Sequence, residues 1–337
     1  MMKSKQVYYY KDEVNDEFSG AKITPRIIDE KYKYIHQNPF WNFTSLLLQN
    51  VLSMPIKILY GKLKFKIKYI GKEKLKSYRK EGYFVYVNHT QVFADVFIPS
   101  LPMYPKRNHF IVNPENVSMK ILGNGIQLLG AIPIPNNKNG MKNFINAIKT
   151  HIEKGHPITI YPEAHIWPYY TKIRPFKAVS FKYPIQYNKP TFCMTNTYQS
   201  YGKNNDKVKI VTYIDGPFFS DKSLSIHEQK LNLRNQVYNC MVERSKNSNI
   251  EVIEYKLQDN DLDWYICMNL NWIIIWQRIY MQKILFYRLT ADAPLFQICL
   301  HQIWNTLLNF KMIFFCLYKL FLGKLNFIIS KKFHWQK

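Results

Sequence analysis

Acidic residues are scarce in this chain of 337 residues: 23 Asp and Glu stand against 47 Lys and Arg, a formal net charge of +24. A basic surplus of this size favours anionic partners, namely nucleic acid, anionic lipid or a phosphorylated substrate. The lysines are scattered rather than gathered in one tract, which argues against a basic arm that binds nucleic acid. A solvated basic surface explains the charge equally well.

Cysteines and phosphate-binding motifs are also scarce. The five cysteines are widely spaced and form no CxxC pair. They predict neither a zinc site nor a disulfide framework, and a reducing compartment fits. No Gly-X-Ser-X-Gly elbow, P-loop or GxGxxG occurs, which excludes the usual serine hydrolases and nucleotide-binding loops. The histidines show no ligand-like spacing, so we expect no metal. The polar start of the chain predicts no signal peptide.

Hydrophobic residues are plentiful at 47%, and aromatic residues make up 16% of the chain. This composition excludes general disorder and allows a sizeable core. Apolar residues recur at helical spacing over 141–152, and a capping box of Ser225 and Glu228 opens a helix through about 244. These helical segments alternate with apolar runs that predict strands. The runs lie at 83–87, 110–112, 131–134, 158–161, 191–197 and 208–213. This alternation predicts an α/β domain with a largely parallel central sheet flanked by helices.

Three further segments surround this domain of residues 63–257. Residues 1–38 are a polar leader. Residues 39–62 form an apolar stretch too broken to span a bilayer, which predicts a helix lying in the membrane interface or, with nearly equal weight, a packed helix. Residues 258–337 form an apolar, basic tail. The tail is either a set of membrane-attached helices or a sequence foreign to the domain, such as translation in a shifted frame, and we favour the second interpretation.

The strongest chemical signal follows the first predicted strand, where His89 and Asp95 lie close together in the sequence. Sheets present reactive groups at the carboxyl ends of their strands. A histidine whose second ring nitrogen is held by a carboxylate is a positioned general base. The alternative is a histidine that only caps the following helix.

A second signal follows the strand at 158–161, where Glu163 is followed by Arg174 and Lys177. A guanidinium can hold a phosphate through two hydrogen bonds, and an ammonium adds a point charge. Alternatively, Glu163 pairs with a nearby base to hold the loop shut, and both functions can coexist.

Together these blocks resemble the glycerolipid acyltransferases, the family of lysophospholipid acyltransferases. Asn88 to Asp95 resembles the NHX4D motif of that family. Tyr161 to Glu163, followed by Pro175 to Lys177, resembles its FPEGTRS and PFK block. Gly130 to Ile134 stands at its glycine-led middle motif, and Lys189 to Phe192 resembles its late proline-containing strand. The resemblance covers roughly 40–250, with four blocks in the right order.

This resemblance implies a reaction. The family moves an acyl chain from coenzyme A or acyl carrier protein to the hydroxyl of a lysophospholipid, 1-acyl-glycerol-3-phosphate above all, with no cofactor. His89 would be the base and Asp95 its support, and the substrate would be bound by Asn88, Thr90, Glu163, Arg174 and Lys177. The implied place is the cytoplasmic face of the cell membrane, peripheral or monotopic, with no nucleic-acid partner. The alternative function is that of a non-enzymatic basic protein that coats membrane or nucleic acid.

The chain departs from the family pattern in three places. Five residues rather than four separate His89 from Asp95, and six helical steps rotate by about 240°, so His89 must precede the helix or the first turn must be irregular. Ala164, His165 and Ile166 replace the Gly-Thr-Arg of the family. The usual arginine of the middle motif is missing, so we expect Arg174 to replace one of two lost phosphate contacts.

Overall fold

The computed structural model describes residues 5–20, 23–119, 123–202 and 207–258. Residues up to Gln258 form one compact unit, and the fold described below belongs to that unit. Nearly all of the predicted tail, 258–337, lies outside the described residues, so our two interpretations of it stay predictions.

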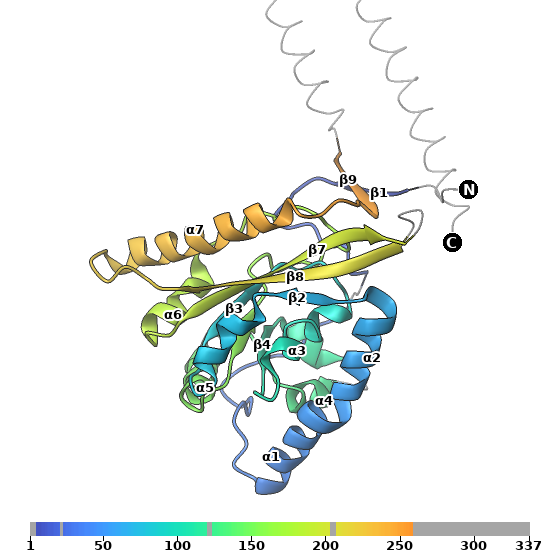
Figure 1. Cartoon of the computed structure of the whole chain (residues 1–337). Coiled ribbons are helices and arrows are strands. Elements are labelled where there is room, and N and C mark those ends of the chain that lie inside the picture. Colours follow the sequence, from blue (N-terminus) through green and yellow to red (C-terminus); the bar gives the residue numbers. More distant parts are fainter. Residues whose placement is uncertain (1–4, 21–22, 120–122, 203–206, 259–337) are drawn as a thin grey trace, which may run out of the picture. The chain divides into compact units, whose positions relative to one another are not determined.

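A seven-stranded sheet forms the centre of the unit, in the order β2-β8-β7-β3-β6-β4-β5. Neighbouring strands run parallel, except for the antiparallel pair of β7 and β8. The predicted largely parallel sheet is therefore confirmed (Figure 1). Its strands are β2 (Lys68–Ile70), β3 (Phe84–Val87), β4 (His109–Val112), β5 (Ala131–Pro133), β6 (Ile158–Ile160), β7 (Thr191–Tyr201) and β8 (Lys207–Phe218).

Strand β3 lies inside the sheet, and all four of its residues are fully buried. This is expected of a parallel strand with helices on both faces. Phe84 and Tyr86 pack into a cluster with α5 (Met141–Glu153) and α7 (Ile226–Ser245). Val85 and Val87 point to the opposite face, into a second cluster. Helix α7 lies along β7 and β8 (Figure 1).

The predicted helices at 141–152 and 225–244 are confirmed, and so is the capping box of Ser225 and Glu228. The shorter elements that the sequence pattern did not indicate fill the connections of the sheet. They are the helices α3 (Ser100–Met103), α4 (Gly123–Leu128) and α6 (Lys182–Gln186) and the 3₁₀ segments η2 (Lys72–Tyr78), η3 (Ala94–Val96), η4 (Pro114–Ser118), η5 (Lys138–Gly140) and η6 (Val179–Phe181).

The leader packs against the domain. Strand β1 (Gln6–Tyr10) pairs in parallel with β9 (Ile253–Leu257) in a small separate sheet. Further along, Ile28 is fully buried and belongs to the cluster beneath α5. The leader therefore joins the two ends of the described unit and contributes to its core, although its composition is polar.

A helical segment covers the predicted range 39–62 and extends to residue 65, as α1 (Pro39–Leu46), the π-helical turn η1 (Leu47–Leu52) and α2 (Ser53–Phe65). Many of its large apolar side chains are exposed, among them Phe40 at 75% and Leu63 at 73%. Among the residues that the structure describes, no helix is long and apolar enough to cross a membrane.

Candidate active site

His89 and Asp95 lie together at the carboxyl end of β3. The Nδ1 atom of His89 is 2.7 Å from Oδ2 of Asp95. His89 lies in the loop before the short helix η3, and Asp95 lies within η3. The expectation that His89 precedes the helix is therefore confirmed. The extra residue in the motif is accommodated because the two side chains meet across a loop rather than along one helix face.

The carboxylate of Asp95 is fixed from several sides. Its Oδ2 also accepts the backbone N–H groups of Thr90 and Gln91, each at 2.9 Å. The Tyr161 hydroxyl donates to the backbone carbonyl of Asp95, and the Tyr161 ring stacks on His89 with centroids 4.3 Å apart. Asp95 is buried, whereas 17% of the His89 side chain is exposed. The arrangement holds the imidazole in place and leaves one edge open to a substrate.

The electrostatics of the pair follow from its burial. Burial raises the pKa of Asp95, and its hydrogen bond to His89 acts in the opposite direction. Oδ2 of Asp95 accepts two backbone N–H groups, so it acts as an acceptor toward Nδ1 of His89 as well. The ring proton of His89 then lies on Nδ1, and Nε2 keeps a free lone pair. Burial and the neighbouring Asp95 charge hold the pKa of Tyr161 well above its ordinary value, so Tyr161 stays neutral.

The loop after β6 closes over the His89 loop. The backbone N–H of Trp167 donates to the carbonyl of His89 at 3.1 Å, and that of Tyr169 donates to the carbonyl of Thr90 at 3.0 Å. Glu163 joins both loops, since its carboxylate accepts the N–H of His89 at 3.0 Å and the N–H of Arg174 at 3.1 Å. The two predicted chemical blocks are thus brought together.

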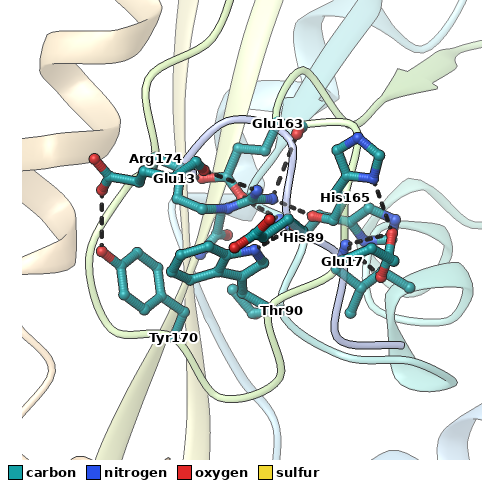
Figure 2. A network of polar contacts seen from close by, with 12 residues as sticks. Glu13, Glu17, His89, Thr90, Glu163, His165, Tyr170 and Arg174 are labelled. Carbon is teal, nitrogen blue, oxygen red and sulfur yellow. Dashed lines mark hydrogen bonds and ion pairs between the residues drawn. The ribbon is translucent and has the colours of Figure 1, made fainter. Parts of the chain in front are cut away.

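Arg174 lies inside this loop and is fully buried (Figure 2). Its Nη2 is 3.6 Å from Oε2 of Glu163 and donates to the carbonyl of His165. Its guanidinium lies 4.9 Å above the ring of Trp167. A buried guanidinium with these partners cannot reach a substrate phosphate. The predicted phosphate contact of Arg174 is therefore wrong, and the alternative in which Glu163 pairs with a base to hold the loop shut is correct.

Three other predicted substrate contacts are also buried and must be corrected. Asn88, Thr90 and Glu163 are at most 4% exposed. The side chain of Asn88 exchanges two hydrogen bonds with the backbone of Asn196 on β7. The hydroxyl of Thr90 accepts a hydrogen bond from Tyr198. These groups are occupied in joining strands and loops, so they position the His89 loop. Lys177 is exposed, and its contact with a phosphate stays a prediction.

The leader supplies contacts that sequence reasoning missed. The Trp167 indole donates to the carbonyl of Asp16 at 2.8 Å and packs edge-on against Phe18. The carboxylate of Glu17 accepts the N–H of Ile166 and lies 3.1 Å from Nδ1 of His165 (Figure 2). The leader thus buttresses the loop that covers the His89 loop. The cluster of aromatic residues at 8–10 was the one signal that such packing existed.

Ala164 explains one departure from the family pattern. Its φ is +64°, in the left-handed region, where a residue with a Cβ is strained by roughly 1–2 kcal/mol. Glycine adopts this conformation without that strain. Ala164 stands where the resembled motif has glycine, and its backbone adopts a conformation that favours glycine.

Comparison with known proteins agrees with this geometry. Residues 66–195 match the family model named Acyltransferase. That range includes β3, the His89–Asp95 pair, Glu163 and Arg174. The predicted resemblance to a family of acyltransferases is therefore confirmed over this range.

Several solved chains resemble this one. One of them is the crystal structure of the 1-acyl-sn-glycerophosphate (LPA) acyltransferase PlsC from Thermotoga maritima, with 17% sequence identity and a TM-score of 0.42. The match covers 62% of this chain and 88% of that one. No curated protein sequence matches the chain.

Proposed function

We propose that the acyltransferase domain moves a fatty acyl group from a thioester, on coenzyme A or acyl carrier protein, to the free hydroxyl of a lysophospholipid. We take 1-acyl-glycerol-3-phosphate as the acceptor to test first. The observation that carries the proposal is the contact of 2.7 Å between His89 Nδ1 and the buried Asp95. It leaves Nε2 of a partly exposed imidazole available as a base.

The reaction requires one proton to move twice. Nε2 of His89 accepts the proton of the acceptor hydroxyl while the oxygen attacks the thioester carbonyl. The carbon–oxygen bond forms, the carbon–sulfur bond breaks, and the imidazolium returns its proton to the leaving thiolate. Asp95 keeps the ring oriented and stabilises the imidazolium. A positioned base of this kind contributes about 10²–10⁴ in rate, and the positioning of two substrates contributes much of the remainder.

An apolar surface beside the dyad supports the proposal of a lipid acceptor. The exposed side chains of α2 include Leu59 and Leu63. The ring of Tyr60 on the same helix contacts Phe93 with centroids 5.4 Å apart. Phe93 is itself 57% exposed and follows His89 by four residues. Exposed apolar patches rimmed by basic residues suit a membrane surface. We therefore propose a peripheral or monotopic protein that reaches its acceptor from the cytoplasmic face of the cell membrane.

Release of free thiol from acyl-CoA and from acyl carrier protein, with a panel of lysolipids, tests the activity. The proposal predicts thiol release that requires a lysolipid with a free hydroxyl and yields a diacyl product. Vesicle binding without turnover on any acceptor would contradict it, and would favour the protein that coats membranes.

A vesicle flotation experiment tests the membrane surface. Changing Leu59 and Leu63 together to Glu should release the protein from vesicles and lower activity on lipid in bilayers. Ile226→Glu is the matched control, because Ile226 is 62% exposed at the start of α7. Equal binding of both variants would show that α2 does not contact the membrane.

A further inference from the structure

Three histidines gather at the edge of the sheet opposite to the His89 dyad. His109 begins β4, His151 lies near the end of α5, and His156 precedes β6. Because β4 and β6 run parallel to β3 within one sheet, these positions lie at the amino ends of the strands, and His89 lies at a carboxyl end. Nε2 of His109 is 3.2 Å from Nδ1 of His156. The cluster therefore takes no part in the proposed acyl transfer.

Ring geometry argues against a metal site, although the ring nitrogens lie within 4.8 Å of one another. A metal ion binds about 2.0–2.1 Å from an imidazole nitrogen, along the lone pair, which points in the ring plane. The rings of His109 and His151 are instead stacked, with centroids 3.6 Å apart and an interplanar angle of 27°. Their lone pairs run nearly side by side and cannot converge on one ion. The positive charges of Arg107 and Lys154 nearby also repel a cation.

The histidines line a cavity of about 360 Å³ between α1 and this edge of the sheet. A water molecule occupies about 30 Å³ of liquid, so the cavity has room for a tetrahedral oxyanion and part of the molecule that carries it. None of the described residues that line the cavity is acidic. Its polar lining includes His36, Arg107, His109, His151, Lys154 and His156.

Three polar atoms in the lining are buried without a partner among the described residues, and one of them is Nε2 of His36. Arg107 donates from Nη2 to Ser45 at 2.5 Å, but its Nε is buried and unpaired. Nδ1 of His151 is also buried and unpaired. No carboxylate of the described residues lies within ion-pair distance of Arg107. Buried donors left unpaired are destabilising, and an acceptor-rich ligand would satisfy them.

We propose that this cavity binds a phosphate-class oxyanion, held by Arg107 and Lys154 together with the three histidines. Arg107 supplies a planar donor that matches a tetrahedral oxyanion, and Lys154 supplies a point charge at the exposed rim. The proposal is independent of the proposed acyl transfer, because it uses neither His89 nor Asp95.

Binding of the anion takes up protons. Burial and repulsion between the rings lower the pKa of His151 to about 3, and burial with the charges of Arg107, Lys154 and Lys106 lowers the pKa of His156 to about 4. Burial, with the same kind of repulsion, holds the pKa of His109 well below its usual range. A bound anion would counter the positive charges around the three histidines and would favour their protonated form. The affinity therefore rises as the pH falls.

A fourth histidine, His36, faces the cavity from the leader. His36 stacks on Trp41 of α1 with centroids 3.9 Å apart, and burial lowers its pKa as well. Trp41 lines the cavity, while its neighbours Phe40 and Phe43 are exposed. A membrane contact by α1 would place a lipid headgroup beside the rim. The anion can thus belong to a headgroup or to a free phosphate compound, and the chemistry of the site is the same for both.

Calorimetric titration of the full chain with sulfate tests the site at constant ionic strength. Sulfate keeps its charge from about pH 8 to about pH 5.5, so a pH dependence over that range reports protons taken up by the protein. We expect saturable binding that tightens as the pH falls, by at most about tenfold per pH unit for each proton taken up. Binding that is independent of pH would overturn the role of the histidines.

Lys154→Gln should weaken sulfate binding about tenfold or more, because a hydrogen bond to a charged group is lost. His156→Gln should remove much of the pH dependence. Arg79→Gln is the matched control, since Arg79 is exposed, lies outside the cavity lining and carries the same charge. Equal weakening by Arg79→Gln and Lys154→Gln would show that sulfate only screens the net charge, and would overturn the proposal.

Two further experiments distinguish a lipid headgroup, a free phosphate compound and a metal ion as the ligand of this cavity. With vesicles of phosphatidylcholine, with and without phosphatidylglycerol, a loss of the phosphatidylglycerol-dependent binding in Lys154→Gln assigns the site to a lipid headgroup. Unchanged vesicle binding with impaired sulfate binding assigns it to a free phosphate compound. Titration with Zn²⁺ is the counter-test. Tight zinc binding that His156→Gln abolishes, together with no sulfate binding, would replace the anion site with a metal site.

Discussion

The buried pair of Glu163 and Arg174 can be broken by changing Arg174 to Met. Methionine fills much of the same volume but leaves the Glu163 carboxylate buried without its counter-charge. Burial already raises the pKa of Glu163, and the charge of Arg174 opposes that rise. The variant should therefore lose stability and should also loosen the His89 loop, whose backbone N–H is bound by the same carboxylate.

The size of the expected loss of stability follows from the burial of Glu163 and Arg174, whose side chains are each 1% exposed. Removing one partner of a buried ion pair costs about 3–5 kcal/mol. For a domain of this size, each kcal/mol lowers the melting temperature by about 2–4 °C. We therefore expect Arg174→Met to melt roughly 6–20 °C below the wild type. The double variant with Glu163→Gln should recover a large part of this loss, because the uncompensated charge is gone.

Thermal denaturation followed by circular dichroism gives the stability, and the Michaelis constants for acyl donor and acceptor give the functional effect. Below the melting temperature both substrates should be affected alike, since Arg174 touches neither. Arg79→Met serves as the exposed control. An unchanged melting temperature with a Michaelis constant raised for the phosphorylated acceptor alone would refute the structural role and restore the phosphate contact.

Three more changes test other parts of the account. Ala164→Gly should stabilise the protein by about 1 kcal/mol, because glycine relieves the left-handed strain, and a lower melting temperature would contradict this. Asp215, which pairs with Lys74 and Arg244, is buried, but these partners outweigh that burial and lower its pKa. Asp215→Asn should therefore cost about 1–2 kcal/mol near neutral pH, a difference that disappears as the pH falls below about 3.8 and is measurable by urea denaturation. Asp95→Asn should lower turnover more than it changes either Michaelis constant.

Periodicity and caps predicted much of the fold. The run at 83–87 is fully apolar because β3 has helices on both faces, and the apolar spacing at 141–152 reflects one buried face of α5. The pairing of β1 with β9 could not be predicted, because it joins residues about 250 positions apart and short strands at the edge of a fold carry little pattern of their own. Nor did the sequence indicate that Ile28 would fill a gap beneath α5.

The sequence predicted the chemistry of the candidate site, but it did not predict which of the site residues are buried. His89 and Asp95 were found because they follow a predicted strand end and lie in a block that resembles the NHX4D motif. Arg174 was assigned to a phosphate because a charged residue in a polar loop is usually exposed. The missing fact was the leader, which covers that loop with Asp16 and Phe18 and buries the guanidinium. The aromatic cluster at 8–10 indicated that the leader packs somewhere, but it did not indicate which loop it covers.

Turnover of a folded His89→Ala protein tests the central claim most directly. The variant should keep the melting temperature of the wild type within a few degrees, since part of the His89 side chain is exposed. With acyl-CoA and 1-acyl-glycerol-3-phosphate, or whichever pair the wild type uses best, its rate should fall by roughly a hundredfold or more. A folded His89→Ala protein that turns over at a near-normal rate would contradict the assignment of His89 as the base.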